Sequence, residues 1–202
     1  MVTRSSKDTK LVVLPGRLVE QLREIAVRRG VSVSSFAAWA LEQAVRAEEM
    51  QASLEETVNV FGIYEIVRGS GAVQIPRSRF NSLISELHRS NKDEQLATWE
   101  KAGRWYGEYL HALLGGEALG FLEKALLVSW NLDEVEINDE DLVVNIRFTS
   151  FIVNLELTEL LVSYILGIMN ALGYETVGKS YLRGLATLSF RKVPSALDFT
   201  LM

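Results

Sequence analysis

The chain of 202 residues has room for one large or two small domains, and its 48% hydrophobic and 23% charged residues are typical of a soluble globular protein. No apolar run approaches the roughly 20 residues needed to span a bilayer, and residues 1–10 contain no apolar signal-peptide core. The absence of cysteine excludes disulfides, thiolate metal sites and thiol catalysis. We therefore expect a cytoplasmic protein that makes no membrane contact.

The charge is unevenly distributed along the chain. Residues 1–46 contain eight Lys or Arg and four acidic residues, a net charge of +4, so the remainder carries −9 and the whole chain −5. A basic segment next to a larger acidic one is typical of a nucleic-acid-binding module attached to a regulatory domain. The alternative is that small surface helices simply vary in charge.

The N-terminal part of the chain predicts a short strand followed by two helices. Alternating apolar residues over 9–14 indicate the strand, and an i, i+3, i+4 pattern indicates helices over 17–29 and from residue 33. Gly30 suits a helix C-cap, and Ser32 suits the next N-cap. A unit of about forty residues cannot bury the apolar faces of both helices alone. We therefore expect a homodimer in which two strands pair as an antiparallel ribbon over four helices.

This segment resembles the ribbon-helix-helix family of DNA-binding proteins, from its K-L-V-V-L-P run through R-G-V-S-V-S-S to the second helix. The resemblance implies that outward-facing strand residues enter the major groove and that backbone amides at the start of the second helix clamp a phosphate. The outward positions are Thr9, Leu11 and Val13. The full set of residues expected at DNA is Arg4, Lys7, Thr9, Lys10, Leu11, Val13, Arg28, Arg29, Ser34 and Ser35.

Two of the three outward strand residues are poorly suited to reading DNA. Leu and Val offer base edges no hydrogen bond and can contact only thymine methyl groups. We therefore expect affinity from phosphate contacts and weak discrimination between sequences. The same residues favour an alternative, in which the ribbon serves only for dimerisation and the protein is a non-enzymatic scaffold.

The rest of the chain predicts an α+β domain of antiparallel strands covered by helices. Helix-forming residues over 48–57 predict a helical connector that continues the second helix and could transmit a rotation. The strands expected beyond it cover residues 58–67, 72–75, 134–137, 142–149, 174–180 and 184–193, with an acidic turn at 138–141. The expected helices cover residues 76–91, 94–114, 117–130 and 157–172.

Two short motifs accompany this order of elements. One is Ala102-Gly103-Arg104-x-x-Gly107, and the other has the spacing of Ser180, Leu182, Gly184, Leu188 and Phe190. With these motifs the segment resembles the 4-vinyl reductase-like domain, whose superfamily includes the TRAPP subunits of Golgi transport and is related to haem nitric-oxide-binding domains. That family carries cysteines where this chain has Ser180 and Leu188, so the resemblance implies a ligand-binding domain without a thiol-based metal or redox role. The expected organisation is a ribbon-helix-helix domain over 1–47, the connector over 48–57, the 4-vinyl reductase-like domain over 58–193 and a tail over 194–202.

Arg104 is the candidate anchor for a small hydrophobic or anionic ligand in an otherwise apolar pocket, because it lies beside Trp105 and Tyr106 in the middle of a predicted helix. An ordinary ion pair for Arg104, and core or dimer contacts for the aromatic residues, are the alternatives. Gly103 and Gly107 form a small-residue strip that would flank either a cavity or a second dimer surface. The candidate ligand-binding residues are Trp99, Arg104, Tyr106 and Tyr164.

No pattern in the sequence indicates catalysis. His88 and His111 have no further ligand at metal-binding spacing on their own helices, so structural or surface roles are expected. The acidic residues 133–141 lack the spacing of a calcium loop, and no phosphate-loop or nucleophile motif occurs. We expect no enzyme activity, no cofactor and no metal. The predicted function is a homodimeric DNA-binding transcriptional regulator with a ligand- or partner-sensing domain; a scaffold and a vinyl-reducing enzyme are the alternatives.

Overall fold

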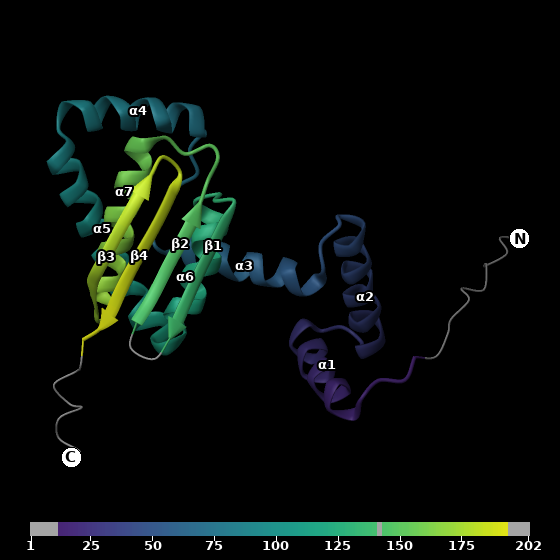
Figure 1. Cartoon of the computed structure of the whole chain (residues 1–202). Coiled ribbons are helices and arrows are strands. Elements are labelled where there is room, and N and C mark those ends of the chain that lie inside the picture. Colours follow the sequence, from purple (N-terminus) through teal and green to yellow (C-terminus); the bar gives the residue numbers. More distant parts are fainter. Residues whose placement is uncertain (1–11, 141–142, 194–202) are drawn as a thin grey trace, which may run out of the picture. The chain divides into compact units, whose positions relative to one another are not determined.

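The computed structural model describes residues 12–140 and 143–193, and the chain divides into two compact units between Asn59 and Val60 (Figure 1). The first unit contains helices α1 (Gly16–Arg29) and α2 (Val33–Glu49), which confirms the two helices predicted there. Gly30 ends α1 with a φ of 67°, a left-handed conformation that glycine adopts without steric cost. The Ser32 hydroxyl accepts a hydrogen bond of 3.1 Å from the Ser35 amide and so caps α2.

The predicted ribbon strand over residues 9–14 is only partly within the described residues. Residues 9–11 lie outside them, and residues 12–14 are assigned to no strand in the single chain. A β-strand forms its ladder of hydrogen bonds with a neighbouring strand, and the predicted neighbour belongs to a second chain. The antiparallel ribbon therefore stays a prediction.

The connector and the two strands predicted next are wrong. Helix α2 ends at Glu49, and Gln51 has a φ of 60°, so the helix does not continue through residues 48–57. Residues predicted as a strand over 58–67 belong to helix α3 (Leu54–Gly69), and residues 72–75 form no strand. The Ser53 hydroxyl accepts the Glu56 amide at 3.0 Å, and acidic residues occupy the first turn, so a favourable helix start outweighs the β-propensity of the Val and Ile residues.

The second unit contains one antiparallel sheet with the strand order β1-β2-β4-β3, as the α+β prediction requires (Figure 1). Its strands are β1 (Glu134–Glu140), β2 (Val143–Thr149), β3 (Tyr174–Leu182) and β4 (Leu185–Lys192). The turn predicted at 138–141 is wrong for Asn138 and Asp139, because these residues still pair with Asn145 and Val144 in the ladder.

Besides the part of α3 from Val60, the described part of the second unit contains helices α4 to α7 and one 3-10 turn. Helices α4 and α5 follow Pro76 and Asn91, and neither side chain accepts a capping hydrogen bond from a backbone amide of its helix. Asn154 caps α7 by accepting the Leu157 amide at 3.0 Å. The bounds are α4 (Arg77–Ser90), α5 (Lys92–Leu114), the 3-10 turn η1 (Gly115–Glu117), α6 (Ala118–Ser129) and α7 (Leu155–Ala171).

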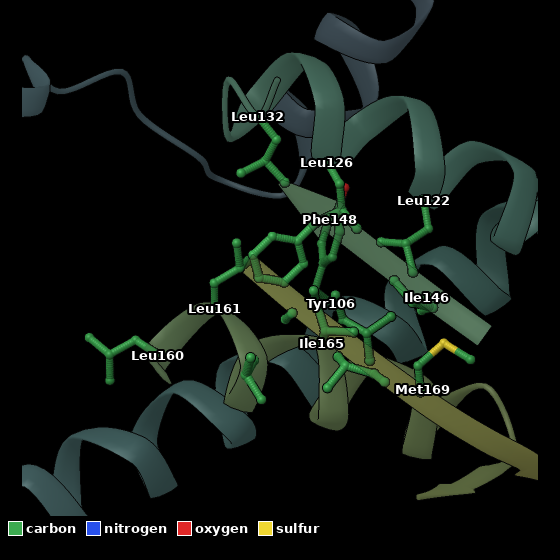
Figure 2. Close-up of a cluster of buried hydrophobic side chains, with 14 of the residues drawn as sticks. Tyr106, Leu122, Leu126, Leu132, Ile146, Phe148, Leu160, Leu161, Ile165 and Met169 are labelled. Carbon is green, nitrogen blue, oxygen red and sulfur yellow. The ribbon is translucent and has the colours of Figure 1, made fainter. Parts of the chain in front are cut away.

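The hydrophobic core lies between one face of the sheet and helices α5, α6 and α7 (Figure 2). Burial alternates along β2 and β4, so every second side chain faces the core. In Figure 2, Phe148 and Ile146 of β2 point toward Leu122 of α6 and Ile165 of α7. The opposite face of the sheet carries exposed polar residues such as Arg147 and Thr187. One covered and one open face is the usual pattern for an antiparallel sheet.

Candidate nucleic-acid interface and candidate ligand site

The start of α2 presents two backbone amides that no described residue bonds. Ser35 donates its amide to the Ser32 cap and Phe36 donates to the Ser32 carbonyl, whereas Val33 and Ser34 precede the first intrahelical donors. The Ser32 hydroxyl also donates to the Ser35 hydroxyl at 2.8 Å. A helix N-terminus with free amides and exposed serines can bind a phosphate oxygen, and the clamp itself stays a prediction.

The two arginines at the end of α1 differ in their contacts. The Arg29 guanidinium lies 5.3 Å from the ring centre of Phe36 and 5.2 Å from that of Trp39, two rings that stack at 5.7 Å. These cation–π contacts hold Arg29 against α2. Arg28 is exposed beside it. Of the two, Arg28 is therefore the better candidate for a phosphate contact.

The remaining DNA residues are mostly outside the part of the chain that the structure describes. This holds for five of them: Arg4, Lys7, Thr9, Lys10 and Leu11. Val13 is described and is 88% exposed, but no strand is assigned there, so its outward position stays a prediction.

The first unit leaves much of its apolar surface uncovered. Ala26 and Ala47 are the buried residues of α1 and α2, whereas Leu18, Trp39 and Leu41 are exposed. An apolar surface of this kind marks an interaction site on a small domain. The single chain therefore does not complete the core of this unit.

The aromatic residues of the predicted ligand site pack against one another. Ring centres lie 6.2 Å apart for Trp99 and Tyr164, 5.9 Å for Tyr106 and Tyr164, and 5.5 Å for Trp130 and Tyr164. These are contact distances for aromatic side chains, so the rings leave no room for a ligand between them. Burial raises the pKa of Tyr106 to about 12 and also raises the pKa of Tyr164. The cluster is part of the core, which is the alternative raised from the sequence.

Arg104 is not in this cluster. Its side chain is 48% exposed, donates to the Asn170 amide oxygen at 2.6 Å and lies 3.8 Å from the Glu100 carboxylate. The structure therefore separates Arg104 from Trp99, Tyr106 and Tyr164, and gives it an ordinary surface contact between α5 and α7.

The small-residue strip of Gly103 and Gly107 is neither a cavity wall nor a free surface, because α7 of the same chain packs against it. A Cβ atom added at Gly103 would lie 2.0 Å from the Tyr164 carbonyl oxygen, and one added at Gly107 would lie 2.6 Å from that of Ile168. Gly167 on α7, which sequence reasoning missed, has the same property: its Cβ would lie 2.0 Å from the Glu100 carbonyl oxygen. The three glycines allow the backbones of α5 and α7 to approach closely.

The second motif, which runs from Ser180 to Phe190, also has a structural role. The Gly184 amide donates to the Thr158 hydroxyl at 2.9 Å, and its carbonyl accepts the Ser150 amide at 2.6 Å. Leu188 is fully buried, whereas Ser180 is exposed and pairs with Thr187 on the other face of the sheet. The two positions that hold cysteine in the resembling family thus face opposite sides here.

One buried ionic cluster was not recognised from the sequence. Glu159 of α7 is only 8% exposed, and its carboxylate lies 2.7 Å from His88 Nε2 of α4 and 2.6 Å from Lys92 Nζ of α5. Burial alone would raise the pKa of Glu159, but the hydrogen bonds from Lys92 and His88 outweigh it and lower that pKa. The Glu159 hydrogen bond raises the pKa of Lys92. The three residues lie on different helices, so no local spacing indicates the cluster.

We expect Glu159→Gln to destabilise the second unit by about 1–3 kcal/mol at pH 7, because it leaves the His88 and Lys92 groups without a charged acceptor. A lowered carboxyl pKa contributes stability that is present above the ordinary pKa and is lost as the pH falls through the folded-state value. The variant should therefore lose less stability than the wild type on acidification. Urea denaturation across the acid range measures both effects. Glu100→Gln, which changes a half-exposed carboxylate, is the control and should behave as the wild type.

The described residues contain no group of three or more His, Cys, Asp or Glu side chains that could hold a metal ion. Among the helices in that part of the chain, none has both the length and the apolar character to cross a membrane.

Comparison with known proteins supports the N-terminal prediction. Residues 11–49 match the family model described as a CopG-like RHH_1 or ribbon-helix-helix domain, RHH_5, so the N-terminal unit carries a ribbon-helix-helix domain. No curated protein matches the chain.

Two solved structures match the chain with low sequence identity and low TM-scores. One, titled "Probing the function of heme distortion in the H-NOX family", has 12% identity and a TM-score of 0.39 over 66% of this chain and 86% of that one. The other, titled "Modulating Heme Redox Potential Through Protein-Induced Porphyrin Distortion", has 10% identity and a TM-score of 0.37 over 64% and 86%. Similarity of this degree carries no conclusion about the ligand of this chain, and the resemblance to the 4-vinyl reductase-like domain stays a prediction.

Proposed function

We propose that this protein is a homodimeric DNA-binding transcriptional regulator of the cytoplasm, in which the first unit binds DNA and the second responds to a partner or ligand. The main support is the ribbon-helix-helix match over residues 11–49. The free amides of Val33 and Ser34 at the start of α2 add support, because helix N-termini of this kind bind phosphate oxygens in other proteins. The uncovered apolar surface around Trp39 supports the homodimer.

For the second unit, a protein partner has more support than a small ligand. The aromatic cluster is closed, and Arg104 lies apart from it on the surface. By contrast, Phe151 and Leu182 are exposed large apolar residues near the end of the sheet. Exposed apolar side chains of this kind are typical of protein interaction sites.

A scaffold function is the second candidate, and Val13 favours it. An outward strand position occupied by an exposed valine offers no hydrogen bond to a base edge. In a scaffold, the ribbon would serve for dimerisation and DNA would bind weakly or not at all.

We expect Val33→Pro to reduce DNA affinity about tenfold, because it removes one amide that would bind phosphate. Val33 is the first residue of α2, where proline is well tolerated. Ser32 already has a ψ of 150°, the extended backbone that a following proline requires. Fluorescence anisotropy with a labelled duplex of random sequence, in a series of salt concentrations, measures the change.

Val33→Ala is the matched control, since it shortens the same side chain and keeps the amide. Affinity should fall steeply with salt for all three proteins, because phosphate contacts release counterions. Circular dichroism checks that α2 is intact in each variant. Equal affinities for the proline and alanine variants would contradict the clamp, and the absence of salt-dependent binding would favour the scaffold.

A further inference from the structure

Helix α3 is apolar on two opposite faces, and the second unit covers one of them. Ile63 is buried, and Ile66 packs against the core cluster. A second stripe on α3 is formed by Leu54, Val58 and Phe61, which follow an i, i+4, i+7 spacing. Phe61 points about 200° around the helix axis from Ile63, so the two stripes face roughly opposite sides. Val58 is 62% exposed and Phe61 is 63% exposed. We call these three residues the outer stripe of α3.

An exposed stripe of this composition needs a partner. The outward face of a solvent-exposed helix normally carries charged or polar residues. Apolar residues on more than one face normally mean that each of these faces is buried. The outer stripe alone is too small for a stable interface between free molecules. Its occupant must therefore be held nearby by another contact.

We propose that the outer stripe of α3 pairs with the same stripe of a second copy of this chain. This inference rests on the proposed homodimer. Only residues 50–53 separate the last residue of α2 from the first residue of α3. A dimer formed through the first unit therefore holds two α3 helices at a high effective concentration, which makes a small interface sufficient. A pairing of like with like is also the form that a two-fold symmetric dimer requires.

The pairing gives α3 a role in the regulator. The helix begins in the first unit at Leu54, continues into the second unit from Val60 and contributes Ile63 and Ile66 there. A partner that shifts the second unit would change how the two outer stripes meet. The pairing thus couples the state of the second unit to the dimer.

The chain has no cysteine, so one introduced thiol reports on the pairing without interference. We expect the full-length Val58→Cys variant to form an interchain disulfide under mild oxidation, seen as a dimer band on a non-reducing gel. Val58 lies in the middle of the outer stripe, so it meets its counterpart whether the helices pair parallel or antiparallel. A disulfide requires the two Cα atoms to lie within about 7 Å of each other.

Glu56→Cys is the matched control, because Glu56 is exposed on the same helix about 200° away from Val58. Cross-linking of the Val58 variant should be at least tenfold faster than that of the control. Phe61→Glu gives a second readout: it should raise the dimer dissociation constant at least tenfold, whereas Asn59→Glu, an exposed change outside the outer stripe, should not.

Light scattering separates failure of this inference from failure of the proposed function. A monomer would overturn both. A dimer in which the two cysteine variants cross-link equally would overturn the α3 pairing and leave the DNA-binding dimer standing. A dimer in which the Val58→Cys thiol is protected from a thiol reagent but forms no disulfide would assign the outer stripe to another segment of the same chain, which also overturns the pairing.

Discussion

Replacing Gly167 with alanine should unfold or severely destabilise the second unit, with an expected loss of about 3 kcal/mol or more in the free energy of unfolding. The added Cβ atom would lie 2.0 Å from the Glu100 carbonyl oxygen and 2.7 Å from the Arg104 amide nitrogen. Both are backbone atoms of α5, so no side-chain rotation can relieve the clash. The helices would have to separate, and the core beneath them would lose contacts around Ile165 and Ile168.

Gly120→Ala provides the control for this experiment. Gly120 is also helical, in α6, and a Cβ atom added there meets no other atom within 4 Å. Because alanine favours a helix over glycine by up to about 1 kcal/mol, this variant should be neutral or slightly more stable. Urea denaturation followed by circular dichroism compares the two. Equal stabilities would show that α5 and α7 do not cross as closely as described.

Replacing Trp39 with alanine should abolish the dimer at micromolar concentration, with an expected cost of about 3–5 kcal/mol. Trp39 is 46% exposed in the single chain, yet it is held in place by the Phe36 ring and the Arg29 guanidinium. An aromatic side chain that is fixed but uncovered is a typical centre of a protein interface. Light scattering of the wild type and the variant measures the change in oligomeric state.

Val27→Ala is the control for the dimer experiment. Val27 is an exposed apolar residue of α1, outside the stripe formed by Leu18, Leu22 and Ile25. Its truncation should change stability by no more than about 0.5 kcal/mol and leave the dimer intact. A wild-type protein that is already monomeric at micromolar concentration would refute the homodimer itself.

Sequence reasoning succeeded where the deciding interactions are local. The ends of α1 and α2 depend on the Gly30 C-cap and the Ser32 N-cap, and each cap acts within a few residues of the chain. The four strands of the sheet were also predicted, within a few residues of their observed bounds.

Residues 58–67 show where local reasoning failed. This run is rich in Val, Ile, Phe and Tyr, which have a high β-propensity. A high β-propensity leads to a strand only when the segment has a neighbouring strand to pair with. In the protein, the Ser53 cap and the burial of Ile63 determine a helix instead. Propensity in such apolar runs is weak compared with tertiary packing.

The sequence by itself therefore determined the ribbon-helix-helix unit, the α+β class of the second unit and the presence of a small-residue strip in α5. Only the tertiary structure decided what that strip contacts, because Gly103 and its partner Tyr164 lie far apart in the chain. It likewise joined His88, Lys92 and Glu159 from three helices and separated Arg104 from the aromatic cluster. The physical reason is the same in each case. Helix periodicity specifies which residues share a face, whereas the partner of that face depends on how distant segments pack.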